Sequence, residues 1–480
     1  MNNRREFIKT LAAAGAVALV QPRLLAGVPK IFPEPWSSEA PVDAWARVPQ
    51  ILRRINAPVF PKRDFSIIRF GAVADGQTDC TKAFHRAIDA CHKVGGGRVV
   101  APAGSFLTGS IHLQSNVNLH VAEGATIKFS RDPLRYLPLV FSRWEGMELM
   151  NYSPFIYAFA KENVAITGKG TLDGQADPEA WWPWNGRAQY GWKEGSPNQR
   201  KDRTALVEMI ERGVPVAERV FGPGHYLRPQ FIQPYRCKNV LIEGVTVKNS
   251  PMWEIHPVLC TNVIVRNVKI TSHGPNNDGC DPESCTDVLI KDCYFDTGDD
   301  CIAVKSGRNA DGRRLNVPTQ NIIVQDCVMK DGHGGITIGS EISGGVRNLF
   351  AENCRLDSPN LDHALRVKNN AMRGGLLEDL HFRNIEVGQV AHAVITIDFN
   401  YEEGANGRFT PVVRNYTVQH LRSGKSKHAL DVQGFKQAPI YNLSLEDCVF
   451  ENVAEPSIVK HVTGLDLRSV KVNGRVVDEM

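Results

Sequence analysis

A short sequence pattern recurs along most of this 480-residue chain and restricts the folds that the chain can adopt. Each copy begins with Asn or Asp, continues with mostly apolar residues, bends at a small or polar residue five positions later, and returns to apolar residues. Two copies begin at Asn116 and Asn163. Eight more follow at intervals of 23 to 36 residues, and they begin at Asn239, Asn262, Asp287, Asn321, Asn348, Asp379, Asn415 and Asn442.

Two short strands joined by a one-residue bend, repeated at this spacing, predict an all-β fold, a right-handed parallel β-helix. A propeller would need about 40 residues per blade and antiparallel hairpin turns, which the pattern lacks. In a β-helix the same position of successive coils stacks at about 4.8 Å. The leading Asn and Asp residues should therefore form a ladder of turn residues.

The eleven cysteines fit the same interpretation. Four of them follow the bend residue, at a position that should point inward, and they are Cys293, Cys327, Cys354 and Cys448. Small apolar core residues explain them, and no spacing resembles a zinc site. We expect mostly free, buried thiols.

The chain divides into three predicted parts. Residues 1–26 combine Arg4 and Arg5 with an apolar run that is too short to span a bilayer, which is typical of a twin-arginine export signal. Residues 27–65 form a Pro-rich, irregular lead-in, and residues 66–480 form the β-helix domain. An amphipathic helix between Asp79 and Gly95 should cap the N-terminal end of the β-helix.

Export predicts a periplasmic or secreted protein with no membrane span. The first 26 residues carry a net charge of +3, so the whole-chain charge of +4 falls to +1 without them. A nearly neutral chain is not built to bind nucleic acid through its overall field. We expect a monomer whose attraction for an acidic substrate is local.

A long loop at about 178–235 interrupts the repeat and is rich in Trp, Pro, Gly and charged residues. Long loops on a regular scaffold often carry function. Its tryptophans could stack against sugar rings or could pin the loop to the body, and the sequence favours neither. They are Trp181, Trp182, Trp184 and Trp192.

Four stretches gather polar residues that packing does not demand: NNDG (276–279), GDDC (298–301), GHGG (332–335) and RVK (366–368). Aligning the strands that follow them puts Asp278, Asp300 and Gly334 in one column. Asp299 and His333 then share the next column. Arg366 and Lys368, two positions apart on a strand, should point outward to one face, with Lys305 in the column of Lys368.

A solvated sheet face alone does not explain this cluster. Carboxylates at strand spacing disfavour each other's ionisation and raise a pKa, so stacking Asp278 on Asp300 costs free energy. The sequence therefore predicts a functional site at these four stretches.

The four stretches, in this order on a parallel β-helix, resemble the signature of the polygalacturonase family of pectin-cleaving glycoside hydrolases. The segments FGAVADGQTDC (70–80) and NSPMWEIHP (249–257) are also similar to that family, so the resemblance covers most of the mature chain. Asn277 departs from the usual NTD pattern conservatively. Residues 307–318 are an insertion that should lengthen the loop before His333 and reshape the cleft.

The resemblance implies hydrolysis of galacturonic-acid-containing plant cell-wall polysaccharides or oligosaccharides, by single displacement with inversion. It implies that Asp299 protonates the leaving oxygen while Asp278 and Asp300 activate water, and that His333 tunes or reprotonates Asp299. Inverting glycosidases do need a protonated acid and a carboxylate base, and clustered carboxylates raise the pKa of the acid.

The resemblance also implies a substrate-binding set. Arg366 and Lys368 suit a substrate carboxylate, Arg through its two-pronged fork. Asn276 and Lys305 join them as substrate-binding residues. No metal ion and no cofactor is required. An outward-facing Lys368 could be truncated with little effect on folding.

Two other classes of function fit parts of the same pattern. In a pectate-type lyase the three aspartates would hold calcium and Arg366 or Lys368 would act as the base. A non-catalytic pectin-binding β-helix is the other alternative, against which the complete acidic set argues. Within hydrolysis, the Trp-rich loop and the insertion at 307–318 could each block one end of a groove and so favour action from chain ends.

Overall fold

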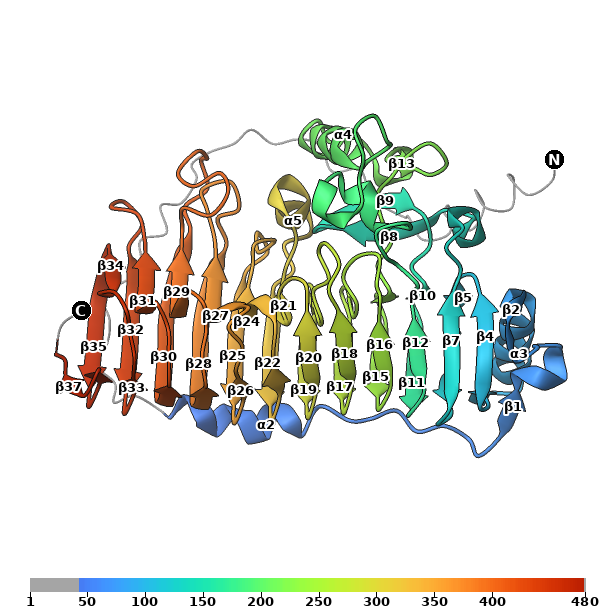
Figure 1. Ribbon diagram of the computed structural model, residues 1–480, viewed down its shortest axis with the longest axis horizontal. Coiled ribbons are helices and arrows are strands. Elements are labelled where there is room, and N and C mark those ends of the chain that lie inside the picture. The colour runs from blue at the N-terminus through green and yellow to red at the C-terminus, as the bar shows by residue number, and fades with distance from the viewer. Residues whose placement is uncertain (1–42, 479–480) are drawn as a thin grey trace, which may run out of the picture. The chain divides into compact units, whose positions relative to one another are not determined.

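Successive coils of the chain stack as parallel strands in the computed structural model, which describes residues 43–478. The coils form the right-handed parallel β-helix that the repeat predicts, with three ladders of strands (Figure 1). The proposed export signal and the first part of the lead-in lie outside the described residues. None of the helices within residues 43–478 is long and apolar enough to cross a membrane.

The first ladder carries the start of each repeat. It consists of β1 (Asp64–Ser66), β3 (Gly97–Ala101), β6 (Val117–Val121), β11 (Glu162–Gly168), β15 (Lys238–Glu243), β17 (Thr261–Arg266), β19 (Thr286–Lys291), β22 (Thr319–Gln325), β25 (Val346–Glu352), β28 (Leu376–Val387), β30 (Val412–Ser423), β32 (Ile440–Glu446) and β35 (Val462–Arg468). Every leading Asn or Asp has a left-handed φ between 54° and 64°. Their side chains are hydrogen-bonded at most steps from coil to coil, as from Asn239 to Asn163 at 2.8 Å, so the predicted ladder is confirmed. Arg47 bridges the step from Asn348 to Asp379.

The second ladder follows the bend residue of each coil. It consists of β2 (Asp75–Asp79), β4 (Gly104–Thr108), β7 (Ala125–Phe129), β12 (Thr171–Asp173), β16 (Thr246–Lys248), β18 (Lys269–Ser272), β20 (Tyr294–Thr297), β23 (Val328–Met329), β26 (Arg355–Leu356), the ends of β28 and β30, β33 (Val449–Phe450) and β36 (Lys471–Val472), against which β37 (Arg475–Val476) pairs antiparallel. Inward side chains of all three ladders form one continuous apolar core. All eleven cysteines are buried and free, as expected.

The third ladder carries the polar stretches. It consists of β5 (Ile111–His112), β10 (Ile156–Phe159), β14 (Ile232–Tyr235), β21 (Ile302–Val304), β24 (Gly332–Ile338), β27 (Leu361–Lys368), β29 (Ala393–Asp398), β31 (His428–Gln433) and β34 (Ile458–Lys460). Single bridges through Ile255 and Cys280 connect β14 to β21. Insertions at the edge of this ladder make a hairpin of β8 (Val140–Trp144) and β9 (Met147–Asn151), with β13 (Val220–Phe221) beside β9.

Helix α3 (Thr81–Lys93) caps the N-terminal end of the core, as predicted. Its buried residues are Ala83, Phe84, Ala87, Ile88 and Cys91. Asp79 accepts the backbone N–H of Thr81 at 2.9 Å, so its carboxylate caps the first turn.

The described part of the lead-in is irregular between Leu52 and β1 but begins with helical residues that the sequence analysis did not predict. Residues 44–47 form a 3₁₀ turn that continues into α2 (Val48–Leu52). Trp45, Val48 and Ile51 pack on apolar residues that face outward from the first ladder, among them Leu241 and Phe350. That outward apolar stripe needs a cover, and the helix supplies it.

Two further helices occupy segments that sequence patterns treat as loops. The Trp-rich segment contains α4 (Arg200–Glu211), and the insertion after Ser306 contains α5 (Asn309–Leu315). Both stand with the β8–β9 hairpin on the same side of the coils, above the third ladder (Figure 1). These insertions, the β8–β9 hairpin, α4 and α5, project beside the polar stretches and are called the wall below.

Candidate active site

The polar stretches stand side by side on the third ladder in the register that the repeat predicts. Cys280 pairs with Ile302, which pairs with Ile336 of β24. This register puts Asp278 beside Asp300, two positions before the paired residues. One carboxylate oxygen from each of Asp278, Asp299 and Asp300 lies within 4.8 Å of the others.

Asp299 and His333 form a close pair on neighbouring coils. His333 Nδ1 lies 3.0 Å from Asp299 Oδ1, and the backbone N–H of His333 donates to the Asp299 carbonyl. Burial disfavours the charged carboxylate, but the hydrogen bond and the charge of His333 outweigh burial and hold the pKa of Asp299 well below its usual range. The same hydrogen bond raises the pKa of His333 to about 9. The two side chains are therefore an imidazolium–carboxylate pair at neutral pH.

Asp278 is in a different electrostatic environment. Burial and then the charge of Asp299 raise its pKa well above the usual value, against the opposing effect of Lys305. Lys305 Nζ lies 3.5 Å from Asp278 Oδ2 and 3.3 Å from Glu341 Oε2, over the ring of Trp253. Asp278 Oδ1 has no hydrogen-bond partner among the described residues. Asp278 thus holds a proton more readily than Asp299 and keeps one oxygen free.

Lys368 is buried, which contradicts the expectation of an outward-facing, solvated lysine. Its Nζ lies 2.5 Å from Asp300 Oδ2 and 5.4 Å from the centre of the Tyr401 ring. Tyr401 belongs to the segment after β29 and covers the strand face on which Lys368 lies. Burial disfavours the ammonium, but Asp300 outweighs it and raises the pKa of Lys368 above the usual range. Truncation of Lys368 would remove the nearest cation from the buried carboxylate of Asp300.

Arg366 also contacts a carboxylate of the cluster, that of Asp300. Its Nη1 lies 3.6 Å from Asp300 Oδ1 and donates to the His333 carbonyl at 3.3 Å. Asn276, the fourth predicted binding residue, accepts from Arg228 Nη2 at 2.7 Å through its Oδ1. The structure therefore brings all eight predicted site residues together, and it pairs Lys305, Arg366 and Lys368 with protein groups.

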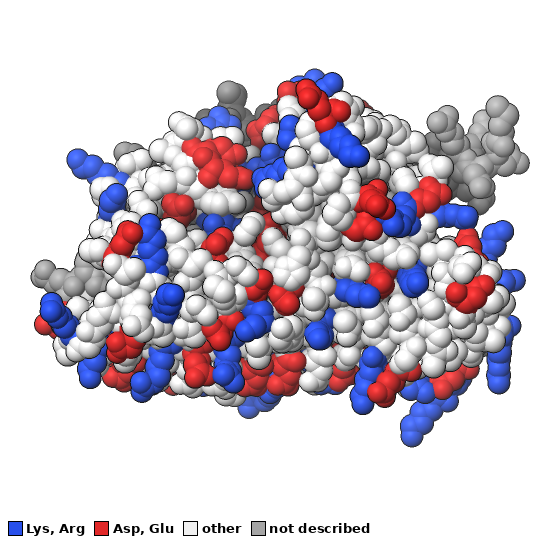
Figure 2. Space-filling view, viewed as in Figure 1, with Lys and Arg blue, Asp and Glu red and all other residues white. Residues whose placement is uncertain are grey.

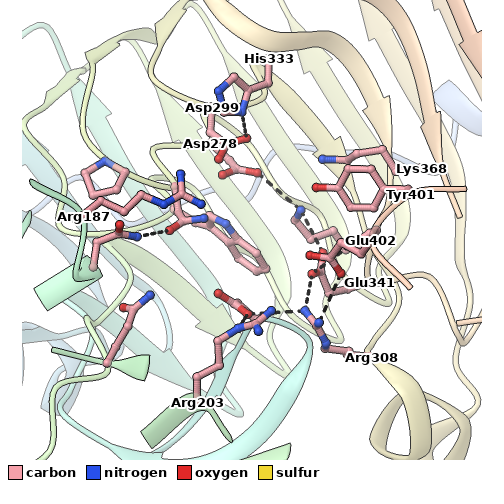
Figure 3. A pocket seen from close by; sticks show the side chains of 18 of the residues that line it. Arg187, Arg203, Asp278, Asp299, Arg308, His333, Glu341, Lys368, Tyr401 and Glu402 are labelled. Atoms are coloured by element: carbon pink, nitrogen blue, oxygen red, sulfur yellow. Dashed lines mark hydrogen bonds and ion pairs between the residues drawn. The ribbon is translucent and has the colours of Figure 1, made fainter. Parts of the chain in front are cut away.

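A cavity of about 390 Å³ opens above these residues. Asp278, Asp299 and His333 lie along one side of it, and side chains from the insertions line the other (Figure 3). The volume is in the range of small-molecule sites. In the space-filling view, basic and acidic side chains both lie around the gap between the projecting insertions (Figure 2).

Ion pairs connect the insertions along one side of the cavity. Arg203 of α4 lies 2.7 Å from Glu145, in the turn between β8 and β9. Arg308, just before α5, contacts the same Glu145 at 3.5 Å, Glu341 at 3.3 Å and Glu402 at 3.4 Å. Five separate segments are thus tied together at this side of the cavity.

None of the four tryptophans of the long loop lines the cavity; Trp192 contacts the loop itself, where its Nε1 donates to the Ser196 carbonyl, and the other three pin the loop to the body. Trp181 is buried in the core, and Trp182 Nε1 donates to the Ser250 carbonyl at 2.8 Å. Trp184 packs edge-on against Trp181 and Tyr226. The side chains that the loop contributes to the cavity are Asn185, Arg187, Tyr190, Gln199, Arg200 and Arg203.

The three aspartates are close enough to hold a metal ion, so the calcium-dependent alternative needs a test against their neighbours. Lys305 and Lys368 already supply positive charge to Asp278 and Asp300. His333 does the same for Asp299. A divalent cation would have to displace these contacts, so the residues fit acid–base chemistry better than calcium binding.

The comparisons with known proteins agree with this chemistry. The family model "Glycosyl hydrolases family 28" matches residues 224–464, half of the chain. The chain belongs to glycosyl hydrolase family 28. A solved exopolygalacturonase from Thermotoga maritima is 49% identical with a TM-score of 0.89, over 91% of this chain and 98% of that one.

More distant relatives of this family 28 protein have consistent names. A probable polygalacturonase of Vitis vinifera is 28% identical over 81% of this chain and 74% of its own length. An exo-poly-alpha-D-galacturonosidase of Dickeya chrysanthemi is 26% identical over 78% of this chain and 65% of its own. Membership makes the protein a glycoside hydrolase, which sets aside the lyase and the non-catalytic binder.

Sequence reasoning missed the cavity residues that the insertions of this family 28 enzyme supply. They are Glu145, Arg187, Tyr190, Arg203, Arg308, Glu341, Tyr401 and Glu402. The insertions have no repeat, so no register could place their side chains. Only Glu341, in the stretch DGHGGITIGSE (331–341), carried a signal, since it follows β24 on the ladder of the site.

Proposed function

We propose that the protein is an exo-acting hydrolase that removes sugars from the ends of galacturonan chains. The observation that carries this proposal is that ion pairs hold the wall closed beside the carboxylates: Arg308 contacts Glu145, Glu341 and Glu402. A polymer lying across Asp278 and Asp299 would have to pass through the wall, whereas a chain end can enter the cavity. The exo-acting names of the Thermotoga and Dickeya relatives support the same mode of action.

In the proposed reaction Asp299 protonates the leaving oxygen. Its proton comes from His333, whose Nδ1 lies 3.0 Å away and whose pKa of about 9 keeps the ring charged. As the sugar displaces water, Asp299 takes the proton and passes it to the glycosidic oxygen. His333 then collects a proton from solvent, because half of its side chain is exposed.

Asp278 and Asp300 activate the attacking water in this proposal. Lys305 and Lys368 stabilise their ionised forms during the reaction. The closest oxygens of the three aspartates lie within 4.8 Å, which is shorter than the roughly 6.5–9.5 Å between the carboxyl groups of most inverting enzymes. In this proposal the attacking water therefore lies to one side of the three aspartates, next to Asp278 and Asp300.

A digestion experiment tests the proposal. Homogalacturonan, rhamnogalacturonan and a methyl-esterified pectin are incubated with the purified chain, and the products are separated and their anomers read by proton NMR. Release of one small acid sugar from homogalacturonan, with little early fall in viscosity and the inverted anomer first, is expected. A ladder of long oligomers would refute exo action, and the retained anomer would refute single displacement.

We also propose that the protein is exported as a folded monomer through a twin-arginine signal in residues 1–26. Support comes from Arg4 and Arg5 before a short apolar run, and from the free thiols, which fit folding before export. Replacement of both arginines by Lys should trap the chain inside the cell, and size-exclusion chromatography of the mature chain should give a monomer.

A further inference from the structure

Arg187 differs from the other basic residues that line the cavity. Lys305, Lys368, Arg203 and Arg308 each contact a carboxylate of the protein. Arg187 lines the same cavity, yet its side chain makes no hydrogen bond or ion pair with any residue of the range 43–478. Arg187 is exposed at the cavity, so its guanidinium is free to bind a ligand there.

Arg200 is the remaining arginine of the cavity, and the protein uses it differently. Its guanidinium donates to the Gly186 carbonyl and lies 5.3 Å from the centre of the Trp192 ring. Arg200 thus holds the loop in shape. In Figure 3 the side chain of Arg187 extends from this loop into the cavity, on the side of Asp278 and Asp299.

The backbone around Arg187 is fixed before any ligand binds. Gly186 adopts a left-handed φ of 85° at the end of one 3₁₀ turn, and Arg187 starts the next. The Gln199 backbone N–H donates to the Trp184 carbonyl at 2.7 Å, which joins the two limbs of the loop. A side chain on a fixed backbone loses less conformational entropy on binding than one on a mobile loop.

The loop also presents an uncharged group suited to sugar hydroxyls. The side chain of Tyr190 lines the cavity, and its hydroxyl makes no hydrogen bond with any residue of the range 43–478. A tyrosine hydroxyl can both donate and accept a hydrogen bond, so it can bind a hydroxyl of a ligand. Asn185 instead supports the loop, since its Nδ2 lies 3.4 Å from Asn276 Oδ1.

We propose that Arg187 binds the carboxylate of the uronic-acid ring that enters the cavity, while the Tyr190 hydroxyl bonds with a hydroxyl of that ring. The inference rests on the proposed function and assigns selectivity for the acid to the inserted loop. A guanidinium and a carboxylate form two parallel N–H···O bonds, which a neutral or esterified sugar cannot accept with the same strength. Arg366 and Lys368 then act chiefly on Asp300.

Three variants test this role. Arg187→Gln removes the charge, Arg187→Lys keeps the charge but loses the fork, and Lys193→Gln removes an exposed positive charge from the same loop away from the cavity. Initial rates are measured on trigalacturonate and on its methyl ester. Loss of a charge-assisted hydrogen bond predicts an increase of about 10- to 100-fold in KM for trigalacturonate with Arg187→Gln, with kcat little changed.

The pattern across variants and substrates decides the role. Arg187→Lys should recover part of the affinity, and Lys193→Gln should match the unmodified chain. The initial rates on the methyl ester should be the same for all three variants as for the unmodified chain. Equal losses on the acid and the ester, or equal losses for Arg187→Gln and Lys193→Gln, would overturn the inference.

Binding of monosaccharides separates this inference from the proposed function. Calorimetric titration of the intact enzyme with D-galacturonate and D-galactose needs no turnover. Tighter binding of galacturonate than of galactose, abolished in Arg187→Gln, supports the inference even if no galacturonan is cleaved. The inference is overturned if galacturonate does not bind, or if the intact enzyme and Arg187→Gln bind it equally, even if galacturonan is hydrolysed.

Discussion

Lys368 Nζ lies 2.5 Å from Asp300 Oδ2, and the carboxylate of Asp300 is completely buried. Asp300 also accepts from the hydroxyl of Thr337 at 3.1 Å. The lysine therefore neutralises a charge that water cannot reach. Its loss acts on Asp300 first and on the substrate second.

Lys368→Ala should lower the free energy of unfolding by up to about 3–5 kcal/mol, because it removes the nearest cation from a buried carboxylate and leaves only Arg366 at 3.6 Å and the Thr337 hydroxyl. Chemical unfolding followed by circular dichroism measures this loss. The double variant Lys368→Met with Asp300→Asn removes both charges and should recover most of the stability. A single variant as stable as the unmodified chain would show that the ion pair is unimportant for folding.

Asp299→Asn should keep the fold and lose about 10²–10⁴-fold in turnover of a natural galacturonide linkage, the usual contribution of general acid catalysis. An aryl galacturonide whose leaving group departs without a proton should lose much less. Asp278→Asn and Asp300→Asn should slow both substrates alike, since each needs an activated water. If Asp278→Asn spares the aryl substrate and Asp299→Asn does not, the acid and the base are reversed.

The pair of His333 and Asp299 should make stability depend on pH at alkaline values. The pKa of His333 is raised to about 9 in the folded chain, from about 6.5 when unfolded. Its contribution to stability is therefore complete below about pH 6.5 and is lost as pH rises through about 9. Melting temperatures between pH 6 and 10 should fall more for the unmodified chain than for His333→Gln. Parallel curves would contradict a charged pair.

Asp299 should make stability depend on pH at acid values, where stability falls as the pH decreases. Its pKa lies below the usual value, so its stabilising effect is present above about pH 4 and is lost as the pH falls below that. The melting temperature of the unmodified chain should therefore drop more steeply below pH 4 than that of Asp299→Asn. A steeper drop in the variant would mean that the carboxylate is not stabilised by His333.

Arg308→Gln should loosen the wall that closes the cavity, because one arginine holds Glu145, Glu341 and Glu402. The viscosity of a polygalacturonate solution should fall faster per bond cleaved than with the unmodified enzyme. Arg212→Gln, an exposed change at the end of α4, serves as the control. An unchanged ratio of viscosity loss to reducing ends would show that other contacts close the cavity.

The sequence predicts the ladders well because the repeat carries their geometry. Each leading Asn or Asp marks a left-handed position, so counting from Asp287 to Asn321 aligns two coils. Aligning the strand residues that follow the polar stretches, Cys280 with Ile302, puts Asp278 beside Asp300 in the same way. The burial of Lys368 could not be found in this way, since it depends on Tyr401, which arrives from an insertion without any repeat.

The same limit explains the role of the long loop. Four tryptophans suggested sugar stacking as readily as anchoring, because composition carries no direction. Only the contact of Trp182 with Ser250 and the packing of Trp182 and Trp184 against the core show that these rings face the body. In the sequence Arg187 is one of many charged residues of that segment, and only the structure shows that its side chain pairs with no group of the described residues.

The eleven buried thiols make unfolding chemically consequential. Cys237, Cys260 and Cys285 stack on successive coils, and the backbone N–H groups of Cys237 and Cys260 each donate to the next sulfur at 3.4 Å. Opening of the coils in an oxidising medium would expose neighbouring thiols together, and any disulfide formed between them would block refolding. The lifetime of the enzyme in such a medium is then set by how rarely its coils open.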